Sequence, residues 1–227
     1  MIGRTNCGAG GGKVSFSINA VKSETVTISQ NGATVMTVTM PGITNASVAV
    51  TLPAGAYTFT GSVGGWTKTA AIGRKTTSVN VWPDRALFWY GRNFAGGWEN
   101  NPVYSKAKPS ISFTDTSVKC TNGVATDSLY ADSRLYLVQQ FAKGSSTMLH
   151  AKLTVTASNS AAPQAHIGLN TSKSNSDLVG TTWTSTGSKT ANINIGTYDR
   201  FYVSFGTSKN SSYSYTTSVE VFAIWLE

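Results

Sequence analysis

Two classes of side chain in this sequence could support catalysis, the carboxylates and the histidines. Asp127 and Asp132 flank the segment SLYA and form the closest acidic pair in the C-terminal half of the chain. Hydrolysis of a glycosidic bond needs two such carboxylates, one of them with a raised pKa. Aspartate is also a common turn residue, because its side chain bonds nearby backbone groups. We therefore interpret Asp127 and Asp132 as turn residues beside a strand.

The two histidines lie in runs that alternate between apolar and polar residues, His150 in TMLHAKLTV and His166 in PQAHIGLN. Neither run contains the Gly-x-Ser-x-Gly context of a serine nucleophile. Cys7 and Cys120 are too few and too far apart for a zinc site or a disulfide framework. We predict a non-enzymatic protein with no cofactor, no catalytic residue and no metal site. Calcium bound by loop aspartates stays open as an alternative, since calcium needs no fixed motif.

Binding through a surface is the chemistry that the remaining residues favour. Sugars are recognised by aromatic faces that cover the apolar side of the ring, surrounded by amide and hydroxyl groups. Two polar loops, at residues 172–188 and 206–216, supply such aromatics in Trp183, Tyr213 and Tyr215. These three residues are our candidates for glycan binding. The alternative is that each of them packs in a core or an interface, as most aromatic side chains do.

The chain begins MIGRTNCGAGGGKVSF, with four glycines in the five residues 8–12. A phosphate-binding loop is excluded, because counting back from Gly12-Lys13 places Cys7 at the required glycine and Val14 at the required hydroxyl. Gly-Arg-Thr-Asn followed by glycines resembles the start of tail-fibre and minor structural proteins of bacteriophages. That resemblance implies a virion protein whose residues 1–13 form a docking arm. Its assembly residues would be Arg4, Thr5, Asn6, Gly8, Gly10, Gly11 and Gly12, and a flexible tether is the alternative.

Composition limits the partners of this protein. Hydrophobic residues make up 40% of the chain, which is enough for a packed core, while charged residues make up only 12%. The net charge of +8 is thinly scattered, and the one basic doublet, Arg74-Lys75, lies in an expected hairpin turn, so nucleic-acid binding is not favoured. No apolar run is long enough for membrane insertion, and glycines stand where a secretory signal would have its apolar core.

Residues 14–82 alternate with period two and predict seven short strands. Val14, Phe16 and Ile18 share one face of the first run, and Asn31-Gly32 separates two later runs as a two-residue hairpin loop would. The sequence from VTISQNGATV to LPAGAYTFTGSVGGW, within residues 24–82, resembles PEGA-like and related immunoglobulin-like modules. The resemblance implies a small antiparallel β-sandwich, although the PEGA tetrapeptide itself is absent.

Residues 83–109 interrupt this rhythm with a cluster of aromatic residues among glycines, between prolines. A solvated linker would not have so many aromatic residues. We predict that this segment connects two domains and is buried against them or against a neighbouring chain. Trp89, Tyr90 and Trp98 are the interface candidates.

Residues 110–227 predict about eight further strands, separated by polar loops, and a jelly-roll-like sandwich. In the last run, Val219, Val221, Ala223 and Trp225 are expected on one face, with Phe222, Ile224 and Leu226 on the other. The predicted fold is therefore all-β, with two antiparallel β-sandwich domains joined by the aromatic-rich segment.

These observations lead to a ranked set of functions. The first is a non-enzymatic bacteriophage structural protein, made in the host cytoplasm and localised to the tail or another exposed part of the virion. Its expected partners are other virion proteins, further copies of itself and host-surface polysaccharide. The alternative is a bacterial cell-surface adhesin or carbohydrate-binding module, and a glycan depolymerase comes third.

Overall fold

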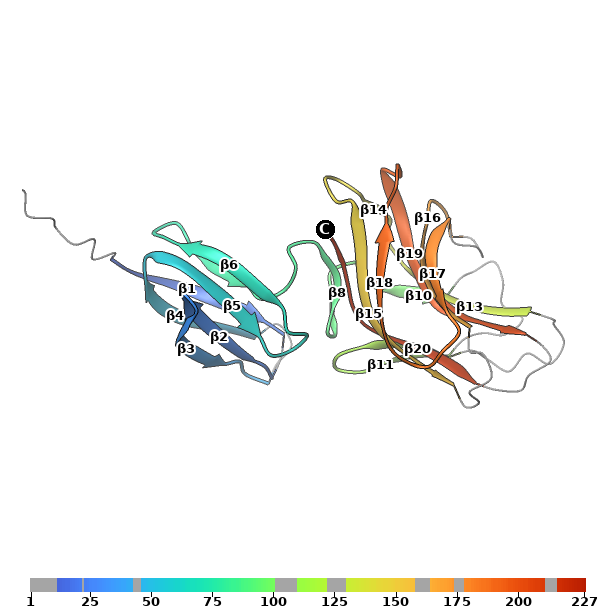
Figure 1. Cartoon of the computed structure of the whole chain (residues 1–227), viewed down its shortest axis with the longest axis horizontal. Coiled ribbons are helices and arrows are strands. Elements are labelled where there is room, and N and C mark those ends of the chain that lie inside the picture. Colours follow the sequence, from blue (N-terminus) through green and yellow to red (C-terminus); the bar gives the residue numbers. More distant parts are fainter. Residues whose placement is uncertain are drawn as a thin grey trace, which may run out of the picture. The chain divides into compact units, whose positions relative to one another are not determined.

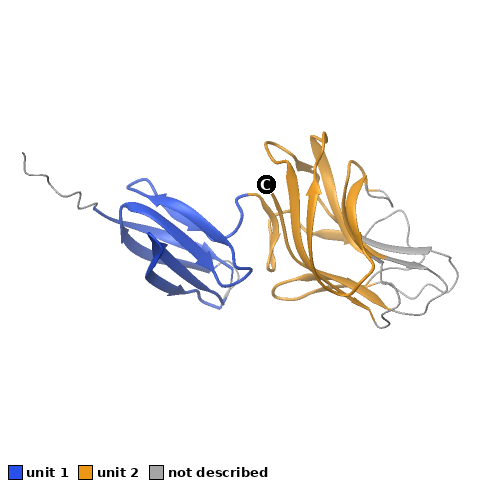
Figure 2. Cartoon of the chain, in the orientation of Figure 1, with its two compact units in different colours: residues 1–84 blue, residues 85–227 orange. Residues whose placement is uncertain are grey.

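The structure is a computed structural model that describes residues 12–21, 23–42, 46–100, 110–121, 130–157, 164–173, 178–210 and 216–227. These residues form strands, turns and loops, with no helix among them. The predicted all-β fold is confirmed. The chain divides into two compact units, residues 1–84 and residues 85–227 (Figure 2). The described part contains no helix of the length and hydropathy that a membrane span requires.

The described residues of unit 1 form seven strands in two sheets (Figure 1). The strands are β1 (Lys13–Ala20), β2 (Thr25–Gln30), β3 (Ala33–Thr39), β4 (Ala46–Pro53), β5 (Gly55–Gly61), β6 (Thr67–Ile72) and β7 (Ser78–Asn80). One sheet has the order β4-β1-β7 and the other β3-β2-β5-β6. All pairs are antiparallel except β1 with β7, which run parallel. The sandwich expected over residues 14–82 therefore has one parallel pair.

The core of unit 1 follows from the alternation of its strands. Val14, Phe16 and Ile18 are all buried, which confirms that they share one face, because the side chains of β1 point alternately to the two faces of its sheet. Phe16 meets Phe59 of the opposite sheet edge to face, with ring centroids 6.1 Å apart. Such pairing adds to the burial that holds the two sheets together.

Two turns of unit 1 were predicted from sequence. Asn31 and Gly32 join β2 to β3 with φ of 51° and 80°, so the predicted two-residue hairpin is confirmed. Arg74-Lys75 also lies in a turn, closed by a hydrogen bond of 2.8 Å from the Thr76 nitrogen to the Gly73 oxygen. That turn is not a hairpin, however, because β6 and β7 belong to different sheets.

Unit 1 also buries one carboxylate. Glu24 is 2% exposed, and its Oε1 and Oε2 accept hydrogen bonds from the Val21 and Val63 nitrogens at 2.9 and 3.2 Å. A Cβ at Gly61 would lie 2.6 Å from Glu24 Oε2, so the glycine leaves the space that the carboxylate occupies. Burial raises the pKa of Glu24 from 4.5 to about 7, because the charged form loses its water.

Unit 2 is a larger sandwich of two antiparallel sheets around one core. One sheet has the order β10-β13-β19-β16-β17, with β14 also paired to β19, and the other has the order β11-β12-β20-β15-β18, with β8 paired to β20 and β9 to β8. The strands are β8 (Ala86–Trp89), β9 (Arg92–Asn93), β10 (Trp98–Asn100), β11 (Ser110–Phe113), β12 (Val118–Thr121), β13 (Tyr130–Leu137), β14 (Phe141–Ala142), β15 (Met148–Ala157), β16 (Gln164–Asn170), β17 (Val179–Trp183), β18 (Gly187–Asn194), β19 (Arg200–Asn210) and β20 (Thr217–Leu226). From β17 to β20 each connection crosses from one sheet to the other, as in jelly rolls.

The boundary between the units differs from the sequence-based expectation. Residues 83–109 were expected to connect two domains, but β8, β9 and β10 are strands of unit 2 and the chain divides after Asp84. The reason is packing: Leu87, Phe88 and Ala95 join the core of unit 2. Residues 101–109 lie outside the described part.

The faces of β20 also differ from the expected ones. Val219 and Val221 lie in the core, but so do Ile224 and Leu226, which were expected on the other face. The cause is a β-bulge: Lys152 of β15 pairs with Ala223, and the next residue, Leu153, pairs with Val221. Phe222 is the extra residue, and it reverses the alternation that follows it.

Candidate functional site

The outer face of the seven-stranded sheet of unit 2 carries a dense set of polar and aromatic side chains. Along β15, Leu149 and Leu153 are buried in the core, while His150, Lys152 and Thr154 are half-buried on the other face. Because cross-strand partners stand side by side, the strand register defines rows across this face. One row is Lys119, Glu220, Thr154 and Ser188, a second is Lys152 and Thr190 beside the bulged Phe222, and a third is Trp225, His150 and Asn192.

A two-residue hairpin between β8 and β9 projects Tyr90 beside these rows. Trp89 pairs with Arg92, so Tyr90 and Gly91 form the loop, with φ of 41° and 90°. Positive φ at both positions is typical of a type I′ turn, which favours Asn-Gly, Asp-Gly or Gly-Gly. A tyrosine there costs about 1–2 kcal/mol, because its Cβ crowds the backbone. Such backbone strain is often found at functional sites.

Gly91 has a separate steric role in this hairpin. A Cβ on Gly91 would lie 2.1 Å from the carbonyl oxygen of Asp115, in the turn between β11 and β12. The backbone of the hairpin therefore lies directly against the neighbouring turn. This close approach fixes the position from which Tyr90 projects.

The hairpin and the bulge of β20 are joined to each other. The Tyr90 nitrogen donates a hydrogen bond of 2.7 Å to the Phe222 oxygen. The two rings have centroids 6.2 Å apart and an interplanar angle of 35°. Two irregular backbone positions thus place two aromatic rings next to each other on an otherwise regular sheet.

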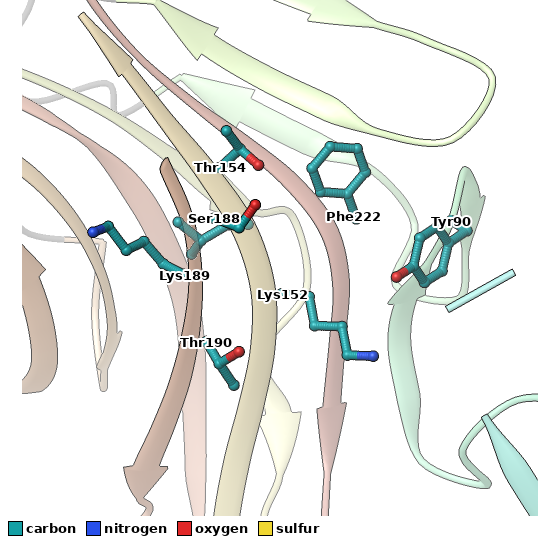
Figure 3. A pocket seen from close by; sticks show the side chains of 8 residues that line it. Tyr90, Lys152, Thr154, Ser188, Lys189, Thr190 and Phe222 are labelled. Carbon is teal, nitrogen blue, oxygen red and sulfur yellow. The ribbon is translucent and has the colours of Figure 1, made fainter. Parts of the chain in front are cut away.

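These rings border a pocket of about 430 Å³ (Figure 3). The pocket is lined by Tyr90, Lys152, Leu153, Thr154, Ser188, Lys189, Thr190 and Phe222. The aromatic rings stand on one side, and the hydroxyls of β15 and β18 on the other. A pocket with apolar walls and a few convergent polar groups is the usual form of a small-molecule site.

The charged groups at this pocket differ in where they point. The ammonium of Lys189 donates a hydrogen bond of 2.7 Å to Ser185 Oγ and is directed away from the rings, whereas Lys152 extends toward Tyr90 (Figure 3). Burial raises the pKa of the Tyr90 phenol, so the hydroxyl stays protonated at neutral pH. Arg92, on the strand after Tyr90, has its pKa lowered by burial.

The third row of the sheet forms an aromatic cluster with one histidine. His150 stacks on Trp225 with ring centroids 5.1 Å apart, and Trp225 meets Trp89 edge to face. His150 Nδ1 lies 2.7 Å from Asn192 Oδ1, and His150 Nε2 lies 3.3 Å from Glu227 Oε2. These contacts hold the imidazole in place on the sheet.

The residues considered for catalysis do not converge in the described part. His166 is buried in β16 of the opposite sheet. Asp127 lies outside the described residues, and the Asp132 side chain is likewise not described. Among the described residues, no group of three His, Cys, Asp or Glu side chains is placed to hold a metal ion.

The predicted binding residues are spread over different places. Trp183, at the end of β17, is half-buried and packs against the core of unit 2. Tyr213 and Tyr215 lie outside the described residues, as do Arg4, Thr5, Asn6, Gly8, Gly10 and Gly11. Gly12 is exposed, and its oxygen accepts a hydrogen bond of 3.2 Å from the Ala54 nitrogen.

Of the three interface candidates, Trp89 is fully buried in β8 and Trp98 packs edge to face on Phe88 and Phe205. Tyr90 lines the pocket. Sequence reasoning missed the other lining residues. The alternation of residues 148–157 indicated that Lys152 and Thr154 share a face, but the strands beside them depend on pairing between distant segments.

Comparisons with known proteins identify no family for this chain. No family model matches it, and no curated protein does. Nothing in them identifies a phage tail-fibre protein or a PEGA module, so both resemblances stay predictions.

Among solved structures, one described as "CBM4 structure and function" matches at 11% identity and a TM-score of 0.40, covering 63% of this chain and 96% of the other. A carbohydrate-binding module of the beta-sandwich superfamily, described for promiscuous specificity, matches at 13% identity and a TM-score of 0.40, covering 94% and 98%. The secreted serine protease VesC from Vibrio cholerae matches at 9% identity and a TM-score of 0.34, covering 96% of this chain and 43% of the protease. At these identities and TM-scores, no function, ligand or partner is transferred from these proteins to this chain.

Proposed function

We propose that this protein binds glycans, without catalysis, through the outer face of the seven-stranded sheet of unit 2. The observation that carries the proposal is the pocket in which the rings of Tyr90 and Phe222 face a polar sheet surface (Figure 3). This is the carbohydrate-binding function that the sequence left as its alternative, at a different set of residues.

The lining of the pocket matches the two chemical characters of a sugar. A pyranose ring has an apolar face of C–H groups, which packs on aromatic rings, and a rim of hydroxyls, which needs donors and acceptors. Tyr90 and Phe222 supply the rings, and Thr154, Ser188 and Thr190 supply hydroxyls that both donate and accept. The volume of about 430 Å³ is in the range of sites for small ligands.

Binding is favoured over hydrolysis by what the pocket contains. Cleavage of a glycosidic bond needs a carboxylic acid and a carboxylate on opposite sides of the bond. None of the eight residues that line the pocket is an aspartate, glutamate, histidine or cysteine. A glycan held there has no general acid or nucleophile among these lining side chains.

A glycan microarray probed with the full chain tests this proposal. We expect binding to a subset of glycans, and we expect Phe222→Ala to abolish it, because the variant removes one of the two rings. Phe113→Ala is the matched control. This ring is 64% exposed, and its register partner Val118 is in the core, so Phe113 lies on the face of the sheet opposite the pocket. Absence of binding to any glycan, or equal loss in both variants, would contradict the proposal.

The place of this protein in a virion stays a prediction, based on the resemblance of residues 1–12 to phage proteins. It is compatible with glycan binding, since a virion protein and a cell-surface adhesin would both use such a pocket for attachment. Mass-spectrometric detection of the chain in purified virions would support it. Normal assembly of a variant that lacks residues 2–12 would contradict the docking role of Arg4, Thr5 and Asn6.

A further inference from the structure

We propose that the pocket selects glycans that carry an anionic group, a carboxylate or a phosphate, and that the Lys152 ammonium and the Tyr90 hydroxyl bind its oxygens. This inference rests on the proposed glycan binding and specifies the class of glycan. It concerns Lys152 of β15 and Tyr90 of the loop between β8 and β9, which line the same pocket beside the bulge described above.

The charge of the lining has one sign. Lys152 and Lys189 are both among the eight lining residues, and none of the eight is acidic. A neutral sugar needs no ammonium group, whereas an anionic oxygen gains a charge-assisted hydrogen bond from one. Partial burial of the site strengthens that interaction relative to open water.

Of the two lysines, Lys152 is the one directed toward the rings. It is half-buried, and its register partners across the sheet are Thr190 and Ala223. In Figure 3 its ammonium and the Tyr90 hydroxyl point toward the same space, while Lys189 is turned toward Ser185. An oxygen placed in that space would receive one hydrogen bond from each group.

Acidic side chains stand in both rows beside the pocket: Glu220 in the first row, and Glu227, whose Oε2 lies 3.3 Å from His150 Nε2, at the third. Glu220 stands directly opposite Lys119 in the register and accepts a hydrogen bond from Ser117 Oγ. Its charge is therefore next to a lysine of its own row. Neither Glu220 nor Glu227 lines the pocket, whose charged lining residues are both lysines.

Tyr90 contributes a hydroxyl that remains a donor. A tyrosine hydroxyl carries its proton at neutral pH, and burial raises the pKa of this phenol further. A phenol hydroxyl donates a strong hydrogen bond to a carboxylate or phosphate oxygen. An anionic group of the ligand therefore suits this position better than a ligand group that can only donate. At its φ of 41°, Tyr90 is more strained than an asparagine would be at the same position.

The test is a binding titration of the full chain with three polymers: polygalacturonate, its carboxyl-reduced form, and a poly(glycerol phosphate) teichoic acid. We expect at least one anionic polymer to bind about tenfold more tightly than the neutral one, as one charge-assisted hydrogen bond implies. Preference for polygalacturonate alone would identify the recognised group as a carboxylate, and preference for the teichoic acid alone would identify it as a phosphate. Raising the salt from about 0.1 M to about 1 M shortens the screening length from about 10 Å to about 3 Å and should reduce the preference.

Lys152→Gln should remove the preference, and Lys152→Arg should restore most of it. Lys189→Gln changes the net charge equally but removes an ammonium that points away, so the preference should persist. Thermal melting of each variant establishes that it is folded. Equal binding of charged and neutral polymers, or equal effects of the two glutamine variants, would overturn this inference while leaving glycan binding intact. Binding of no glycan at all would overturn the proposed function itself.

Discussion

Two hairpin loops of this molecule have similar φ angles and different residues. Asn31-Gly32 joins β2 to β3 in unit 1 with φ of 51° and 80°, and Tyr90-Gly91 joins β8 to β9 in unit 2 with φ of 41° and 90°. The first loop has the residues that this turn favours, and the second has a bulky aromatic residue at the same position. The second loop also borders the pocket.

This difference indicates what each hairpin does. At Asn31 the residue favours the positive φ that the turn requires, so local preference and fold agree. Reversal of the chain direction is then a sufficient role for this loop. At Tyr90 they disagree, and the surrounding structure holds the residue in place through the bond to the Phe222 oxygen and the close approach of Gly91 to Asp115. Departures from local preference of this kind concentrate at functional sites.

The largest difference between the hairpins is expected at their glycines. Gly91→Ala should lower the free energy of unfolding by about 3–5 kcal/mol, because the new Cβ adds backbone strain and overlaps the Asp115 oxygen. Gly32→Ala should lower it by about 1 kcal/mol, since a Cβ added there would meet nothing within 4 Å and only the positive φ is unfavourable. Chemical denaturation of both variants measures the two values, and equal losses would contradict the steric role of Gly91.

A second difference is the kind of unfavourable feature in each unit: unit 1 has a buried carboxylate, and unit 2 has a strained tyrosine. Unit 1 buries the Glu24 carboxylate, whose pKa in the folded chain is raised to about 7. The folded state then holds a proton that the unfolded state releases near pH 4.5, so stability falls as the pH rises from about 4.5 to about 7. The loss over that range is about 3 kcal/mol, at 1.36 kcal/mol per pKa unit.

Melting curves of the full chain and of Glu24→Gln across this pH range test that expectation. The variant has no proton to release, so its stability should depend less on pH between about 4.5 and about 7. The two chains would have parallel pH profiles if Glu24 titrated normally in the folded protein.

Exchanging the first loop residues should have a smaller effect, which destabilises the protein at Asn31 and does not at Tyr90. Asn31→Tyr should destabilise the protein by about 1 kcal/mol, because tyrosine is strained at positive φ. Tyr90→Asn should leave the stability unchanged or raise it by up to about 1 kcal/mol, since relief of strain offsets the loss of a half-buried ring. Denaturation midpoints of the two variants give the comparison, and a large loss in Tyr90→Asn would show that Tyr90 is needed for folding.

The same comparison shows how far the sequence could predict this molecule. The strands of unit 1 and the Asn31-Gly32 hairpin were predictable because alternation and turn chemistry are local signals. The pocket was not, because Phe222 becomes a bulge only through pairing with Lys152 and Leu153, which lie far away in the chain. Tyr90 was singled out for its aromatic surroundings, but tyrosine is not a turn residue, and nothing local showed that it would occupy a hairpin loop.

Trp183 shows the opposite limit of sequence reasoning. A tryptophan in a polar loop sequence is a reasonable candidate for sugar binding, yet in the structure it packs against the core of unit 2. Aromatic content alone does not distinguish a ring that faces a ligand from one that faces the core, because both environments favour an aromatic side chain.

The most direct test of the central claim is to measure stability and glycan binding of the Tyr90→Asn variant side by side. We expect a melting temperature equal to or above that of the unchanged chain, together with at least a tenfold loss of affinity for the glycan that binds best. That result would show that the chain keeps a strained tyrosine at the pocket for binding and not for folding. Unchanged affinity in a folded variant would contradict the claim.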